Sequence, residues 1–256
     1  MSQPLLHGFE SLLRNSNFDP SKKTVVLVHG WQNTPTSDFN VHLTFAYLAA
    51  EDVNLIMTDW SKGAAGEYLP AVINNIASGT QVGKFVSWVN SVTGARVSQY
   101  HIIGHSLGAH QAGIIGRALD KQVPYITALD PPLLGWIFNP HRITPDVAIY
   151  TEVMHTDVVA GILDAVGHVD FYPNGGRGMP GCSDSSCDHH QCIFYMAESL
   201  TRGGFTGIRC ETLENAVIHG NCAGPETLQM GGTTPKTGST GIYHLTTNAF
   251  SPFSQG

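Results

Sequence analysis

One serine lies where a catalytic nucleophile is expected. Ser106 is the centre of the segment GHSLG, flanked by Gly104 and Gly108, which matches the pattern G-x-S-x-G. In a chain with 28 glycines this match alone is weak evidence. Its surroundings are more informative, because residues 100–103 predict a strand and residues 107–119 predict a helix. A strand–turn–helix elbow lifts the serine hydroxyl above the sheet edge, and the two glycines are needed because a Cβ would strike neighbouring backbone.

A serine hydroxyl becomes a good nucleophile only when a histidine takes its proton and a carboxylate holds that histidine. In folds with this elbow the chain order is serine, acid, histidine. Asp130 follows the next predicted strand, where side chains emerge beside the elbow. Asp157 and Asp170 are alternatives further along the chain, and we interpret them as structural hydrogen-bonding groups in loops.

The candidate base is His189, which we place in a cysteine-rich loop just before a helix at 190–200. From there its ring could reach back over the serine. The residues alone leave His155, His168 and His190 open as alternatives. We interpret two further histidines, His29 and His105, as loop and elbow scaffolding.

Ester or amide chemistry at a serine also needs two backbone N–H groups that stabilise the oxyanion. One is predicted at Leu107, directly after the nucleophile. The other is predicted at Trp31, in the loop after the first buried strand, where Gly30 lets the backbone turn its amides inward. The Trp31 ring is equally well explained as an apolar wall of the acyl pocket.

These residues need an α/β scaffold, and the pattern predicts one. Short apolar runs alternate with longer amphipathic stretches, which is typical of a doubly wound, mainly parallel sheet in a single domain over residues 1–256. Strands are predicted at 24–28, 53–58, 100–103, 125–129, 148–154, 169–172 and 242–247, and helices at 41–50, 68–92, 107–119 and 190–200. Gly79 and Gly83 are expected to break the helix at 68–92.

Composition excludes several classes of partner. The net charge is −7 and no basic run is longer than Lys22-Lys23, which argues against nucleic acid and against electrostatic membrane binding. No apolar stretch is long enough to span a membrane. Only 13% of the residues are charged, which suits a protein that meets lipid but equally a small enzyme with a polar, uncharged surface.

All five cysteines lie between 182 and 222, which indicates local disulfides and an oxidising, extracellular location. Residues 1–9 show no signal peptide. A zinc site built from Cys182, Cys187, His189 and Cys192 is an alternative, but the spacing fits no standard zinc motif.

The motifs together resemble the pancreatic-lipase-like family of secreted lipases and phospholipases A1. The similarity covers about residues 16 to 253 and is carried by the oxyanion segment at 17–31, GHSLGAH at 104–110, ALDPP at 128–132, HTD at 155–157, GHVDFYPNGG at 167–176 and MPGC with CDHHQC at 179–192. The resemblance implies an α/β-hydrolase fold and ester hydrolysis. It also implies that the base is His189, which occupies the family position after Cys187-Asp188.

The resemblance further implies disulfides Cys182–Cys187 and Cys210–Cys222, with Cys192 as a free thiol. The stretch between Pro131 and Ala148, where the family binds calcium, contains a single acidic residue, Asp146. We therefore expect no metal and no other cofactor. Few residues precede the oxyanion segment, and the sequence ends where the family's catalytic domain ends. We therefore expect no C-terminal β-sandwich and no colipase-type partner.

The expected substrate is a lipid ester at a membrane or micelle surface. Between the lid cysteines lie only Ser183-Asp184-Ser185-Ser186, which span at most about 14 Å when extended. So short a lid resembles that of phospholipase A1 members. Alternatives are a triacylglycerol lipase, a galactolipase or general esterase, and, in another class, a non-catalytic lipid-binding or yolk-type protein.

Overall fold

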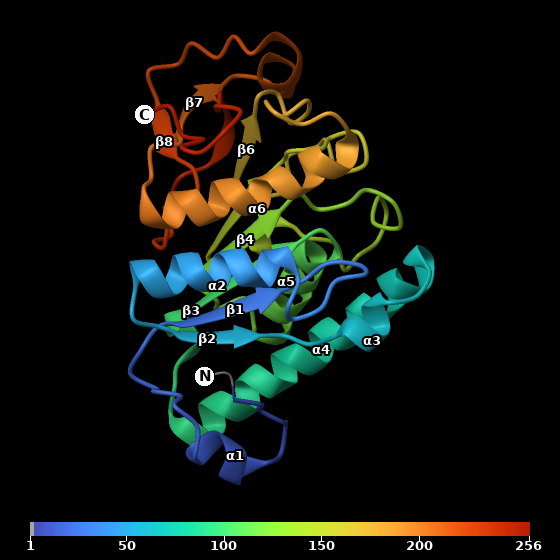
Figure 1. Ribbon diagram of the computed structural model, residues 1–256, viewed down its shortest axis with the longest axis vertical. Helices are drawn as coiled ribbons and strands as arrows, with labels where there is room; N and C mark the ends of the chain where they lie inside the picture. The colour runs from blue at the N-terminus through green and yellow to red at the C-terminus, as the bar shows by residue number, and fades with distance from the viewer. Residues whose placement is uncertain (1–2) are drawn as a thin grey trace.

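A computed structural model describes residues 3–256 and contains one nine-stranded sheet (Figure 1). The strand order is β2-β1-β3-β4-β5-β6-β9-β7-β8. The strands from β2 to β9 in this order pair in parallel, and β7 and β8 complete the sheet in antiparallel pairing. The strands are β1 Thr24–Val28, β2 Asn54–Met57, β3 Tyr100–His105, β4 Tyr125–Leu129, β5 Tyr150–Met154, β6 Val169–Pro173, β7 Thr206–Cys210, β8 Thr227–Gln229 and β9 Gly241–Leu245.

Helices cover both faces of this sheet (Figure 1). On one face α2 packs against α6, and on the other α4 packs against α5. The central strands are therefore buried on both sides, which explains their continuous apolar runs. In β1, for example, Val25 and Leu27 join the core with Met196 of α6, while Val26 and Val28 join the core with Ile115 of α5. The helices are α1 Glu10–Arg14, α2 Asp38–Ala50, α3 Ser61–Ala64, α4 Tyr68–Thr93, α5 Leu107–Ala118 and α6 Ser185–Thr201, with short helical turns at Val97–Gln99, Pro145–Val147 and Asn215–His219.

The predicted α/β class and mainly parallel sheet are confirmed, and every predicted strand and helix is present. The predicted break in the helix at 68–92 is wrong, because α4 runs without interruption through Gly79 and Gly83. A Cβ at Gly83 would lie 2.4 Å from the Cβ of Ala118 on α5. Glycine is therefore required there by close helix packing and does not end the helix.

The start of α6 also differs from the prediction. The helix begins at Ser185, so His189 lies inside it and not in a loop before it. The Asp184 carboxylate accepts a hydrogen bond from the backbone N–H of Cys187 at 2.9 Å, which caps the helix. The polar run before the histidines suggested a loop, but it is the helix N-terminus.

Candidate active site

Ser106 lies at the sharp turn between β3 and α5. Its backbone has φ 56° and ψ −127°, a conformation that non-glycine residues adopt mainly where function requires it. A Cβ at Gly104 would lie 1.9 Å from the carbonyl oxygen of Gly108, and a Cβ at Gly108 would lie 2.0 Å from that of Val28. Strand, turn and helix can therefore approach this closely only with glycine at both positions.

His189 and Asp130 form a hydrogen-bonded pair next to this turn. Asp130 follows β4, and its Oδ2 lies 2.5 Å from Nδ1 of His189. The other oxygen, Oδ1, accepts hydrogen bonds from the backbone N–H groups of Thr156 and Asp157 at 2.7 and 2.9 Å. Because the carboxylate accepts at every contact, Nδ1 of His189 carries the proton, and Nε2 is left to accept one.

The electrostatics of the pair favour a charged imidazole. Burial lowers the pKa of His189, but the hydrogen bond and the negative charge of Asp130 outweigh it, so the pKa lies above the ordinary value of 6.5. The histidine side chain is 22% exposed, whereas that of Asp130 is 2% exposed. The His189 ring is thus open to the cavity, while the carboxyl group of Asp130 is not.

Ser106 and His189 line the same cavity, which has a volume of about 630 Å³. Its walls include the side chains of Trp31, Tyr68 and Leu134. Within residues 3–256 no hydrogen bond joins Ser106 Oγ to the imidazole. Catalytic hydrogen bonds are often long before substrate binds, so this geometry is compatible with proton transfer between the two residues.

The residue before the serine fixes the backbone of the histidine. Nε2 of His105 donates to the carbonyl oxygen of His189 at 3.0 Å, and the Cys192 thiol donates to the same oxygen at 3.3 Å. The His105 ring lies 4.7 Å from that of His189, centre to centre. Burial holds the pKa of His105 well below 6.5, so its ring is neutral. The elbow and α6 are therefore tied together at the site.

Both predicted oxyanion donors have free backbone N–H groups. Neither the Trp31 nor the Leu107 N–H donates a hydrogen bond within the described part of the chain. Leu107 is the first residue of α5, where N–H groups lack helical partners and the helix dipole favours negative charge. The Trp31 ring lines the cavity, and its indole N–H donates to Gly66 O at 2.8 Å. The two interpretations of Trp31, as donor and as wall, are compatible.

The other candidate histidines have different surroundings. His155 lies 2.8 Å from Asp170, and the two side chains are 1% and 2% exposed. His168 accepts a hydrogen bond from the backbone N–H of Thr151. His190 also lines the cavity, but its Nδ1 contacts the Ser186 carbonyl and not a carboxylate. Only His189 combines a carboxylate partner with access to the cavity.

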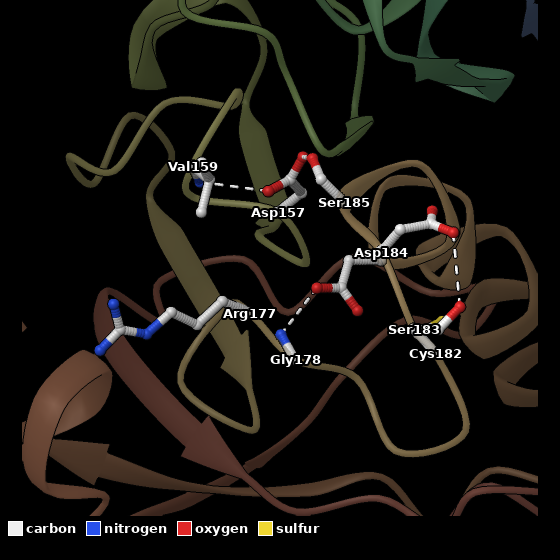
Figure 2. A pocket seen from close by; sticks show the side chains of 9 residues that line it. Asp157, Val159, Arg177, Gly178, Cys182, Ser183, Asp184 and Ser185 are labelled. Atoms are coloured by element: carbon white, nitrogen blue, oxygen red, sulfur yellow. Dashed lines mark hydrogen bonds between the residues drawn. The ribbon is translucent and has the colours of Figure 1, made fainter.

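A second cavity, of about 550 Å³, adjoins the first and shares Asp157 and Ser185 with it. Figure 2 shows these two side chains in contact, with Arg177 pointing away from Asp184. The carboxylates here already bind the protein: Asp157 and Asp184 accept backbone N–H groups, and Asp188 accepts those of Gly178 and Met179. They hold the neighbouring loops and the start of α6 in place.

The structure contains both disulfides implied by the resemblance, Cys182–Cys187 and Cys210–Cys222, and Cys192 is a buried free thiol. The zinc alternative is wrong, because two of its four ligands are bonded to each other. Over residues 3–256 no group of three or more histidine, cysteine, aspartate or glutamate side chains is arranged to hold a metal ion.

In the same range no helix is both long and apolar enough to cross a membrane.

The topology defines a protein of α/β-hydrolase fold, and its candidate site brings Ser106 to the same cavity as the hydrogen-bonded His189 and Asp130. The chain belongs to the Lipase family, whose model matches residues 3–253. It is 34% identical over 213 residues to pancreatic lipase-related protein 2 of Cavia porcellus, covering 79% of this chain and 49% of that protein. It is 33% identical over 231 residues to pancreatic triacylglycerol lipase of Sus scrofa, covering 79% of this chain and 51% of that protein.

The chain thus spans about half the length of the curated relatives it matches. Among solved structures, a phospholipase/carboxylesterase from Dyadobacter fermentans is similar at 17% identity with a TM-score of 0.40, covering 54% of this chain and 68% of that chain.

Proposed function

We propose that this protein hydrolyses carboxylic esters of lipids through an acyl-enzyme intermediate. The observation that carries the proposal is the 2.5 Å contact between Asp130 and His189 in the cavity that Ser106 lines. Ser106 Oγ attacks the ester carbonyl while Nε2 of His189 accepts its proton, and Asp130 stabilises the imidazolium. The oxyanion accepts from the N–H groups of Trp31 and Leu107.

In the next step the ester C–O bond breaks, and the imidazolium gives its proton to the departing alcohol oxygen. Water then enters, and His189 takes its proton as the oxygen attacks the acyl carbon. The acid is released when the bond to Ser106 Oγ breaks and the serine is reprotonated. Apart from the substrate and water, the residues of the chain supply every group in these steps, so we propose that the reaction requires no metal or cofactor.

Within this chemistry we propose a phospholipase A1-like preference for polar lipids. The support is the short segment between Cys182 and Cys187, of which Ser185 and Ser186 already belong to α6. Such a segment offers no large apolar flap to cover the cavity or to bind an oil droplet. A triacylglycerol lipase is the second candidate, because that is the name of several of the relatives.

Hydrolysis of phosphatidylcholine vesicles, a triolein emulsion and a short nitrophenyl ester, measured side by side, tests both proposals. Ser106→Ala serves as the blank. We expect fatty acid from the sn-1 position of phosphatidylcholine, a slower rate on triolein, and no jump in rate at the critical micelle concentration. A sharp jump with faster triolein cleavage would favour the triacylglycerol lipase.

We further propose that residues 1–256 act as one catalytic domain in an extracellular setting. Support comes from the single sheet that runs from β2 to β8 and from the two disulfides. Loss of activity under reducing conditions would agree with an extracellular setting. Unchanged activity in EDTA would agree with the proposal that no metal is required.

A further inference from the structure

One side of the cavity mouth carries a group of exposed apolar side chains. They come from two segments, the start of α4 and the loop after Asp130. We call this group the apolar face; its members are Leu69, Ile73, Leu134, Ile137 and Phe138. Phe138 is 96% exposed and Ile73 is 70% exposed. Large apolar groups exposed together commonly mark a surface that binds something apolar.

The loop that carries three of these residues is held from below. Trp136 is fully buried, and its ring stacks on His110 with centres 3.9 Å apart. Nε2 of His110 donates to Pro132 O at 2.9 Å, while Nδ1 accepts from the N–H of Ile143 at 3.1 Å. Burial lowers the pKa of His110 to about 3, which keeps this ring neutral and the bonding pattern fixed.

Two arginines hold the far end of the same loop. Arg117 donates to the carbonyl oxygens of His141 and Arg142, and Arg142 donates to that of Ile137 at 3.2 Å. The inner side of the loop is therefore occupied by these contacts. Phe138 and its neighbours cannot turn inward without breaking them, so their exposure is built into the loop.

The two segments of the apolar face adjoin each other and the cavity. Tyr68 donates from its hydroxyl to Leu134 O at 3.1 Å, and both residues line the cavity of Ser106. A Cβ at Gly135 would lie 3.8 Å from a methyl group of Leu69. The apolar face is thus continuous with the opening through which a substrate reaches the serine.

Charge indicates what kind of surface this face meets. Residues 68–83 and 131–140 contain no lysine, arginine, aspartate or glutamate, in a chain whose net charge is −7. An uncharged face on an acidic protein suits an interface without net charge and is repelled by an anionic one.

We propose that the apolar face inserts into the surface of a zwitterionic lipid aggregate and so holds the cavity mouth against it. This proposal rests on the proposed lipid hydrolysis for its biological meaning, but binding itself does not depend on catalysis. The occupant is the lipid surface and not a second copy of the chain. Helix α4 lies on the sheet face opposite α2 and α6 (Figure 1), so side chains on α2 provide a control away from this face.

The test is sedimentation of the full chain with vesicles of diether phosphatidylcholine, which has no ester to cleave. We compare wild type, the double variant Ile73→Ser/Phe138→Ser, and Phe45→Ser. Phe45 is 73% exposed on α2 and serves as the matched control. We expect the double variant to partition at least about tenfold more weakly, since it loses two large apolar anchors. The control should bind like wild type.

Hydrolysis separates this proposal from the proposed function. On ester phosphatidylcholine vesicles the double variant should lose rate in parallel with binding, while its rate on a soluble nitrophenyl ester stays that of wild type. Absence of wild-type binding, equal binding by the double variant, or an equal loss in Phe45→Ser would each overturn the docking proposal. So would a dimer in wild type that the double variant abolishes, which would identify a second copy as the occupant. Vesicle binding without hydrolysis of any ester would instead refute the proposed function alone.

Discussion

Two histidine–aspartate pairs lie at the same end of the sheet, and they differ in what the second ring nitrogen meets. In the His189–Asp130 pair, Nε2 has no hydrogen-bond partner among residues 3–256 and the ring borders the cavity. In the His155–Asp170 pair, the second nitrogen lies 2.8 Å from the carbonyl oxygen of Ile162. The same two residue types thus do different things. His189 has a ring nitrogen that can take up a proton, whereas His155 joins Asp170 to the Ile162 carbonyl through hydrogen bonds.

Every polar atom of the buried pair has a partner. Asp170 already accepts hydrogen bonds from the N–H groups of Val166 and Gly167, and the Ile162 carbonyl can only accept. Both nitrogens of His155 are therefore occupied, Nδ1 by the Ile162 carbonyl and Nε2 by Asp170. No nitrogen is left to act as a base.

The two pairs are also connected through the chain. The residues directly after His155 are Thr156 and Asp157, whose N–H groups hold Asp130. The His155–Asp170 contact therefore positions the two backbone N–H groups that orient Asp130. The difference teaches that access of the second nitrogen, and not the presence of a carboxylate, distinguishes a base from a structural histidine.

The largest effect is expected when the cavity-facing pair loses its base. His189→Ala should lower kcat by about 10⁶-fold, as Ser106→Ala should, because a triad acts as a unit. Since the His189 side chain is 22% exposed, water can take its place beside Asp130, so the variant should remain folded. Steady-state kinetics and circular dichroism check this. His190→Ala is the matched control and should keep most of its activity; an inactive His190 variant beside an active His189 variant would contradict the assignment.

Asp130→Asn should lower kcat by about 10⁴-fold, less than loss of the histidine. The amide keeps the shape but can donate to Nδ1, which then places the proton on Nε2 and removes the acceptor for the serine. The rate on a soluble nitrophenyl ester measures this. Asp170→Asn is the comparison variant, and a loss of kcat as large as that of Asp130→Asn would remove the distinction between the pairs.

Breaking the buried pair should act on stability. His155→Ala leaves the buried Asp170 side chain and the Ile162 carbonyl without the ring that they contact, and an unsatisfied buried polar group costs about 1–3 kcal/mol. Urea unfolding measures this loss, and the loss in kcat of the folded variant should be far smaller than that of His189→Ala. A variant with unchanged unfolding but no activity would show that His155 takes part in the chemistry.

The pH dependence gives the smallest effect, about tenfold per pH unit on the acid limb. Because the pKa of His189 is raised above 6.5, activity should fall below that raised pKa, where the base is protonated. The stability from the Asp130 contact runs the opposite way: it is fully present below 6.5 and lost as pH rises through the folded pKa. A pH–rate profile checks the first statement, and an acid limb centred below 6.5 would contradict it.

Sequence reasoning located the elbow, the central strands and Asp130, because apolar runs and glycine spacing report buried strands and tight turns directly. It could not choose His189 over His190 from the residues alone, since that choice depends on how α6 is turned toward the cavity. The His155–Asp170 contact was equally hidden. It joins the residue after β5 to one inside β6, so it depends on strand register, and only the structural role of Asp170 was expected.

The hairpin of β7 and β8 was missed for a different reason. These edge strands are short and only partly buried, with Gly207 and Arg209 inside the first of them. Five and three residues are too few to show a clear run or alternation of apolar residues, and β7 joins the sheet by pairing with β9 on one side and β8 on the other.

The contact between His105 and the His189 carbonyl has a consequence for motion. It fastens the end of β3, next to Ser106, to α6, which carries His189, so we expect thermal fluctuations to displace the two segments together. Their separation then requires α6 to leave α2 and the core residues that it packs against, and we expect that step to belong to global unfolding. On heating, loss of activity should therefore coincide with loss of tertiary structure and not precede it.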